Sequence, residues 1–157
     1  MSVDGLIADL KKGIGMVRVT AAAELGRLKD KRAEKALIDA LEDGNLAVRS
    51  NAAFALGELG SQAAVPRLLS LFHDPGERVR KSAVKAMGMM GARDAVPALI
   101  AIIGSDQSRI VKKSAIRSLG QIGGQKALRA VEPLVSHPDT LLAETAKKAV
   151  VLMKKES

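Results

Sequence analysis

The side chains best suited to catalysis or metal binding are scarce in this sequence. There is no Cys, Trp or Tyr, and the two histidines, His73 and His137, lie far apart. No HExxH, GxxxxGK[ST] or GxGxxG motif is present, and no serine has a His/Asp relay. Thioether ligands are available from Met87, Met89, Met90 and Met153, but without Cys or a nearby His we interpret these methionines as core side chains. We therefore expect no catalytic residue, no metal site and no cofactor, and a protein that is not an enzyme.

Basic side chains are the second group that could bind a ligand. The chain has 25 Lys and Arg against 17 Asp and Glu, a formal net charge of +8, which favours an acidic partner. Residues 77–90 and 108–122 hold eight of these cations and one acid, Glu77. Leaving out Arg80 and Lys112, the other six form what we call the basic ridge: Arg78, Lys81, Lys85, Arg109, Lys113 and Arg117. The ridge is either a solvated helix surface or a site for an acidic partner or nucleic acid.

The two phenylalanines, Phe54 and Phe72, occupy apolar positions of predicted helices, and we interpret both as core residues. A protein without exposed aromatic rings lacks the platform on which single-stranded bases stack. Sequence-specific recognition of single strands is therefore not expected.

A repeat of about 31 residues determines where all these side chains lie. Valines 17, 48, 79 and 111 each begin a similar segment, VRVTAAAELGRL, VRSNAAFALGEL, VRKSAVKAMGMM and VKKSAIRSLGQI, with a glycine nine residues later. Each glycine is followed by a turn and a second apolar run, such as AVPRLLSLF from Ala64. The apolar positions recur at helical spacing within both runs. Each repeat is thus a pair of short helices, which can bury its apolar faces only by stacking on its neighbours.

The repeat predicts an all-α fold, an α-α superhelix of about ten helices in antiparallel pairs, in a single domain over residues 1–157. The expected units span residues 15–43, 46–73, 77–104 and 108–136, with half-units at 2–12 and 139–154. The fourth unit is irregular, because Pro133 interrupts its second run. The helix register within 125–138 is therefore open, and that second helix is expected to be short, broken or shifted.

The D-x5-R junctions, the (A)LGxLG helix ends and the AVPxL starts make the chain resemble HEAT-like repeats of the phycobilisome-lyase type, over nearly its whole length. Proteins with such repeats include lyase subunits and scaffolds. A HEAT-like di-iron hydroxylase would need several His-Glu dipeptides, but Asp74 follows His73 and Pro138 follows His137.

HEAT repeats also carry an Asp in the inter-repeat turn and a basic residue six positions later. The matching residues here form a predicted structural ladder: Asp43 with Arg49, Asp74 with Arg80, and Asp106 with Lys112. We expect each carboxylate to cap a helix and to accept hydrogen bonds from a basic side chain. The ladder should fade at the ends, where Lys12 precedes Arg18 and His137 precedes Ala143.

Three functions remain open at this point. The first is a non-catalytic scaffold that binds a protein on the concave face, which the second helices should line. The residues expected to face outward there include Arg32, Lys35, Ala36, Asp39, Arg67, Ser70, Ala98 and Ala101. The second is binding of nucleic acid or an acidic partner on the basic ridge, and the third a lyase-like subunit acting only with a partner chain. Self-association through the end helices is also possible. The lack of cysteine and of a long apolar run predicts a cytoplasmic protein with no membrane segment.

Overall fold

The computed structural model describes residues 1–156, and within them it contains ten α-helices and no strand. The first helix of each pair is long: α2 (Gly15–Leu28), α4 (Leu46–Leu59), α6 (Glu77–Met90), α8 (Arg109–Ile122) and α10 (Thr140–Lys155). The second is usually shorter: α1 (Val3–Lys12), α3 (Glu34–Ala40), α5 (Val65–Ser70), α7 (Val96–Ser105) and α9 (Gln125–Val131). The all-α prediction is confirmed, and α4 and α6 begin where the second and third repeats were expected to begin.

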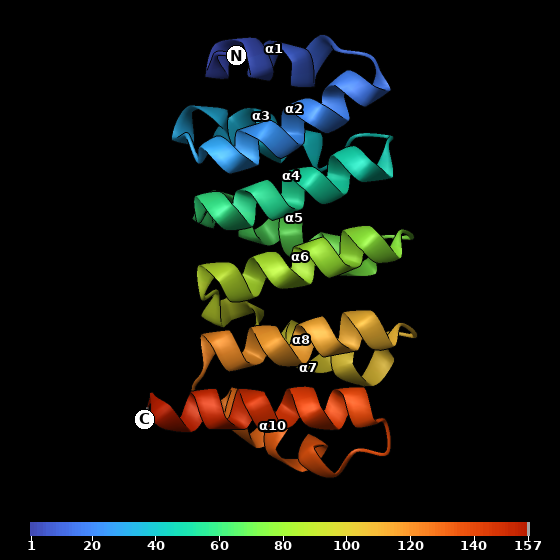
Figure 1. The fold of residues 1–157 in the computed structure, drawn as a ribbon, viewed down its shortest axis with the longest axis vertical. Coiled ribbons are helices and arrows are strands. Elements are labelled where there is room, and N and C mark those ends of the chain that lie inside the picture. The colour runs from blue at the N-terminus through green and yellow to red at the C-terminus, as the bar shows by residue number, and fades with distance from the viewer. Residues whose placement is uncertain (157) are drawn as a thin grey trace. The chain divides into compact units, whose positions relative to one another are not determined.

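The chain divides into two compact units, one formed by residues 1–86 and one that starts at residue 87. In the first unit, α2 and α4 lie side by side, and α1 and α3 pack against them from one side (Figure 1). In the second unit, α8 packs against α10, while α7 and α9 contact α8. The first helices thus form one layer of each unit and the second helices another. That residues 1–157 form a single domain stays a prediction.

The repeated glycine allows the first helices to touch. A Cβ atom added at Gly26 would lie 3.0 Å from Ala55 Cβ, and one at Gly120 would lie 2.9 Å from Ala149 Cβ. Both distances are shorter than a relaxed carbon–carbon contact. Glycine at this position is therefore a packing requirement of the layer.

The core is built from small and aliphatic side chains, as the composition predicts. Val48, Leu56, Leu68 and Leu99 are fully buried, and Phe72 is only 2% exposed. The interpretation of Phe54 as a core residue was wrong, because its side chain is 40% exposed. Since α4 is apolar on nearly all sides, the spacing of its apolar residues does not reveal which side faces the core.

The fourth helix pair is irregular. Helix α9 ends at Val131, and the five-residue 3₁₀ helix η5 (Glu132–Ser136) follows it. Pro133 has no N–H group with which to continue the α-helical hydrogen bonds. The second helix of this pair is thus short, and the tighter 3₁₀ turn carries the chain to His137.

Candidate functional site

Arginine–aspartate pairs join consecutive turns in the first unit. Arg18 donates from Nε to Asp43 Oδ2 at 2.8 Å and from Nη2 to Oδ1 at 3.1 Å, while its Nη1 donates to the Gly13 carbonyl at 2.9 Å. Arg49 repeats the arrangement on Asp74, at 2.9 and 3.1 Å, and on the Asp43 carbonyl, at 2.9 Å. Each arginine, near the start of α2 or α4, therefore binds a carbonyl of the loop before its own helix and the carboxylate of the next loop between repeats. Such two-pronged contacts are geometrically specific.

Because each arginine binds the aspartate of the following loop, the ladder does not fade at Arg18 as we expected. We expected the ladder to fade at Arg18, because Lys12 replaces the aspartate of its own turn. Arg18 nevertheless has a full partner, since the carboxylate it binds belongs to the following turn. Arg80 makes the same carbonyl contact as Arg18 and Arg49: it donates to the carbonyl of Asp74, in the loop before its own helix, at 2.9 Å.

Asp43 and Asp106 do not cap the helices that follow them, contrary to our expectation, because Asn45 and Ser108 do so. Asp43 Oδ1 accepts from the Asn45 backbone N–H at 2.8 Å, and Asn45 is the residue that caps α4. Asp106 accepts in the same way from Ser108, the cap of α8. Each aspartate therefore shapes the turn that presents the cap. Burial of Asp43 opposes its ionisation, but hydrogen bonds from Arg18 and Asn45 outweigh burial and lower the pKa of the carboxyl.

The second unit contains a different pair. Arg109 Nη2 lies 2.8 Å from Asp139 Oδ1, and Asp139 also caps α10 through the N–H groups of Leu141 and Leu142. The hydrogen bond from Arg109 is the largest cause that lowers the pKa of Asp139, to about 2. Within residues 1–156, Lys112 forms no ion pair, because the position it would reach in the next turn is occupied by His137.

The residues expected on the concave face belong to the layer of second helices. Arg32, Lys35, Asp39, Arg67, Ser70 and Ala101 are exposed and Ala98 is half-buried, whereas Ala36 is buried, contrary to expectation. Asp39 lies 3.9 Å from both Lys35 and Arg67, while Arg32 is held by Asp30 at 2.8 Å. Exposed pairs of this kind contribute little to stability and can rearrange around a partner.

The six residues of the basic ridge are divided between the two units. In the first unit, Lys85 Nζ lies 5.8 Å from the centre of the Phe54 ring, within the range of a cation–π contact. In the second unit, Arg109 is paired with Asp139, so it is not the free surface cation that we expected. Lys113 and Arg117 line a groove instead.

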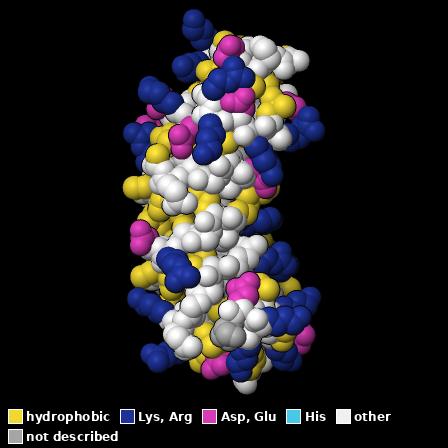
Figure 2. Space-filling model, turned by 90° about the vertical axis from the view of Figure 1, so that its left-hand side faces the viewer, with side chains coloured by type: hydrophobic (Ala, Val, Ile, Leu, Met, Phe, Trp, Pro, Cys, Tyr) yellow, Lys and Arg dark blue, Asp and Glu magenta, His cyan; other side chains and the backbone are white. Residues whose placement is uncertain are grey.

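This groove, which we call the α8–α10 groove, has a volume of about 320 Å³. Its lining comes from two neighbouring first helices: Lys113, Arg117 and Gln121 of α8, and Leu141, Glu144, Thr145, Lys148, Ala149 and Leu152 of α10. The face of the molecule on which α10 ends carries many Lys and Arg side chains (dark blue), with apolar ones (yellow) among them (Figure 2). The α10 residues were missed at the sequence level, where we considered only the buried side of that helix.

A smaller groove of about 260 Å³ lies between α2 and α4 in the first unit. Gly26, Ala23 and Ala55 line it together with the exposed ring of Phe54, and Arg27 and Glu58 lie at its polar side. The small residues that allow α2 and α4 to touch also leave the space that forms this groove. This groove is mainly apolar.

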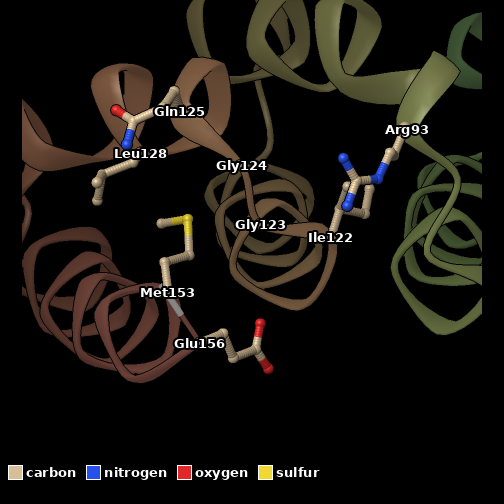
Figure 3. Close-up of a pocket in the computed structure, with 8 residues that line it drawn as sticks. All are labelled: Arg93, Ile122, Gly123, Gly124, Gln125, Leu128, Met153 and Glu156. Atoms are coloured by element: carbon tan, nitrogen blue, oxygen red, sulfur yellow. The ribbon is translucent and has the colours of Figure 1, made fainter.

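A third cleft, of about 270 Å³, lies at the turn between α8 and α9 (Figure 3). Gly123 and Gly124 form the turn with φ angles of 74° and 93°, a region that favours glycine. Met153 of α10, Glu156 directly after that helix and Arg93 also line this cleft. Across residues 1–156, no three His, Cys, Asp or Glu side chains gather as metal ligands would.

The stacked helix pairs, the glycine contacts and the turn arginines define a HEAT-like superhelix. The sequence matches the HEAT repeats family over residues 3–87 and 71–151. The chain belongs to this family.

Solved structures are similar over almost the whole chain. A chain in the complex of CpcE and CpcF of phycocyanin lyase from Nostoc sp. PCC7120 is 30% identical, with a TM-score of 0.86, covering 99% of this chain and 66% of that chain. A designed armadillo repeat protein in complex with the peptide (KR)4 is 20% identical, with a TM-score of 0.74, covering 96% of this chain and 81% of that one. This second likeness shows the fold alone. No curated protein matches the sequence.

The resemblance to lyase-type HEAT-like repeats is thus confirmed. The expectation that the protein is not an enzyme is contradicted, because the similar Nostoc chain belongs to a phycocyanin lyase. The present chain spans slightly less than two thirds of that protein's length. The similar Nostoc chain occurs in a complex of two proteins, CpcE and CpcF. Within residues 1–156 no helix is long and apolar enough to cross a membrane, and the cytoplasmic location stays a prediction.

Proposed function

We propose that this chain is a HEAT-like subunit of a lyase-type assembly and acts only together with a second protein. The observation that carries this proposal is the 30% identity, over 99% of this chain, to a chain of a two-protein lyase complex. The chain's own chemistry agrees with dependence on a partner. Its least exposed ion pairs, Arg18–Asp43 and Arg49–Asp74, are structural contacts between repeats. Within residues 1–156, no acid and base that line the same one of the grooves described above form an ion pair with each other.

We further propose that the partner binds on the layer of second helices of the first unit, over Arg32, Lys35, Asp39, Arg67 and Ser70. The same layer of the second unit, with Ala98 and Ala101, offers a second surface of this kind. The side chains of these residues are exposed, except that of Ala98, which is half-buried. Lys35 and Arg67 share one carboxylate, Asp39, at 3.9 Å each. A partner carboxylate could therefore recruit either cation without breaking a buried contact. The small side chains of Ser70, Ala98 and Ala101 would leave space for larger residues of the partner.

Affinity capture from the native host, analysed by mass spectrometry at low and high salt with and without nuclease, tests the proposal. We expect one protein to be retained in near-stoichiometric amount after nuclease treatment. Capture of nucleic acid only, or loss of every protein when nuclease is added, would contradict the proposal.

Two variants with the same change of charge then locate the surface. Lys35→Glu/Arg67→Glu alters the layer of second helices, and Arg78→Glu/Lys81→Glu alters α6. We expect the first variant to lose the captured protein and the second to retain it. The reverse pattern would place binding on the basic ridge. A retained partner that confers lyase activity on the mixture, absent from either chain alone, would complete the test.

A further inference from the structure

The α8–α10 groove carries positive charge that the protein itself does not neutralise. Lys113, Arg117 and Lys148 line the groove, and within residues 1–156 none of them forms an ion pair. The one carboxylate in the lining, Glu144, lies 3.0 Å from Lys147, outside the lining. Lys113 and Arg117 are also four residues apart on one helix, where like charges repel each other. This arrangement is unfavourable for the isolated protein and favours an anionic ligand.

The same groove is apolar at both ends. Leu141 and Leu152 of α10 line it, and Leu152 is 40% exposed. Their separation of eleven residues corresponds to about three helical turns, or roughly 16 Å. The base of the groove is set where Gly120 packs against Ala149, with no room for a Cβ on the glycine. An occupant therefore needs apolar groups about three turns apart as well as negative charge.

These requirements describe an amphipathic helix with acidic flanks. We propose that the α8–α10 groove docks an acidic amphipathic helix of a protein partner. Its leucine-like residues contact Leu141, Ala149 and Leu152, and its carboxylates approach Lys113, Arg117 and Lys148. Helices commonly bind in grooves in this way, with apolar residues at i, i+4, i+7 and i+11 as anchors. The proposal concerns the layer of first helices, so it stands or falls independently of the surface proposed above for the lyase partner.

A nucleic acid fits the groove less well. Glu144 would face the phosphates, and no aromatic side chain lines the groove to stack on a base. Two leucines have no role in binding a sugar–phosphate backbone, whereas they match the apolar side of a helix. The combination of cations and leucines is what favours the peptide.

Fluorescence anisotropy with the full chain tests the proposal. The probe is a fluorescein-labelled helical peptide of about 16 residues with leucines at i, i+4, i+7 and i+11 and glutamates beside them. We compare it with a version that has lysines in place of the glutamates, a version that has serines in place of the leucines, and a single-stranded oligonucleotide of equal charge. We expect only the acidic, leucine-bearing peptide to bind well.

Three variants identify the site. Lys113→Glu/Arg117→Glu should weaken binding of the acidic peptide by about tenfold or more, and Leu152→Ser by about threefold to fivefold. The control Lys11→Glu/Lys12→Glu makes the same change of charge on α1 and should alter affinity by less than about twofold. Circular dichroism confirms that each variant is folded. No binding by the acidic peptide, equal binding by the lysine version or the oligonucleotide, or equal weakening by the control would each overturn the proposal.

Discussion

Arg49 in α4 and Asp74 in the loop before α6 lie 25 residues apart in the sequence, yet their side chains meet, with Arg49 Nε 2.9 Å from Asp74 Oδ2. The Asp74 side chain is 7% exposed and that of Arg49 17% exposed. Arg49 also holds the carbonyl of Asp43 in its own turn. One guanidinium therefore fixes the spacing between two repeats, and this contact is a natural point at which to test how the repeats are held together.

Replacing Asp74 with Asn should destabilise the protein by about 2–4 kcal/mol, because Arg49 would lose its charge partner in a mostly buried position. Urea denaturation followed by circular dichroism measures the change. The control Glu24→Gln removes the exposed pair with Arg27 and should cost less than about 1 kcal/mol. If both substitutions had the same small effect, the pair between turns would not hold the repeats together.

Gly120→Ala should destabilise the protein by about 1–3 kcal/mol, because the added Cβ would lie 2.9 Å from Ala149 Cβ. Gly104 in α7 is a matched control, since a Cβ there would meet nothing within 4 Å. Gly104→Ala should stabilise the protein by about 0.5–1 kcal/mol through its higher helix propensity. Thermal melting of the two variants should thus shift in opposite directions. If both substitutions raised the melting temperature, helix propensity alone would decide both positions.

The helix pairs could be predicted because the signal was local and repeated. Val48 and Leu56 fall on one side of a helix at the expected spacing, and both are fully buried. The sequence did not show that each arginine binds the aspartate of the following loop and not the aspartate of its own loop. The D-x5-R pattern places Asp43 in the loop before α4 and Arg49 near the start of α4, but only stacking brings Arg49 to Asp74 in the next loop.

Only the α8 side of the α8–α10 groove could be predicted from the sequence. Lys113 and Arg117 stood out because acids are missing around them, whereas Lys148 and Leu152 lie on a helix of mixed charge. Their meeting depends on how closely Gly120 approaches Ala149. Contacts between repeats therefore had to come from the structure.

The two phenylalanines should respond differently to truncation. Phe72→Ala removes a ring that is 2% exposed and should cost about 3–5 kcal/mol. Phe54→Ala removes a ring that is 40% exposed and should cost only about 1–2 kcal/mol. Chemical denaturation of both variants under the same conditions measures the difference. Equal costs would show that Phe54 is a core residue after all, as its sequence position first indicated.

The pair between Arg109 and Asp139 should make stability depend on pH in the acid range. Arg109, as the largest cause, and the backbone N–H groups of Leu141 and Leu142 lower the pKa of Asp139 from 3.8 to about 2, so the unfolded chain binds the proton first as the pH falls. The stabilisation is therefore complete above about pH 4 and is lost as the pH falls toward about 2. Asp139→Asn keeps a side chain that can cap α10 but removes the titrating group. Melting temperatures between about pH 5 and 2 should fall less steeply for this variant than for the unmodified protein, and Arg109→Gln should likewise reduce the slope. Identical slopes in all three proteins would rule out this pair as a source of the acid sensitivity.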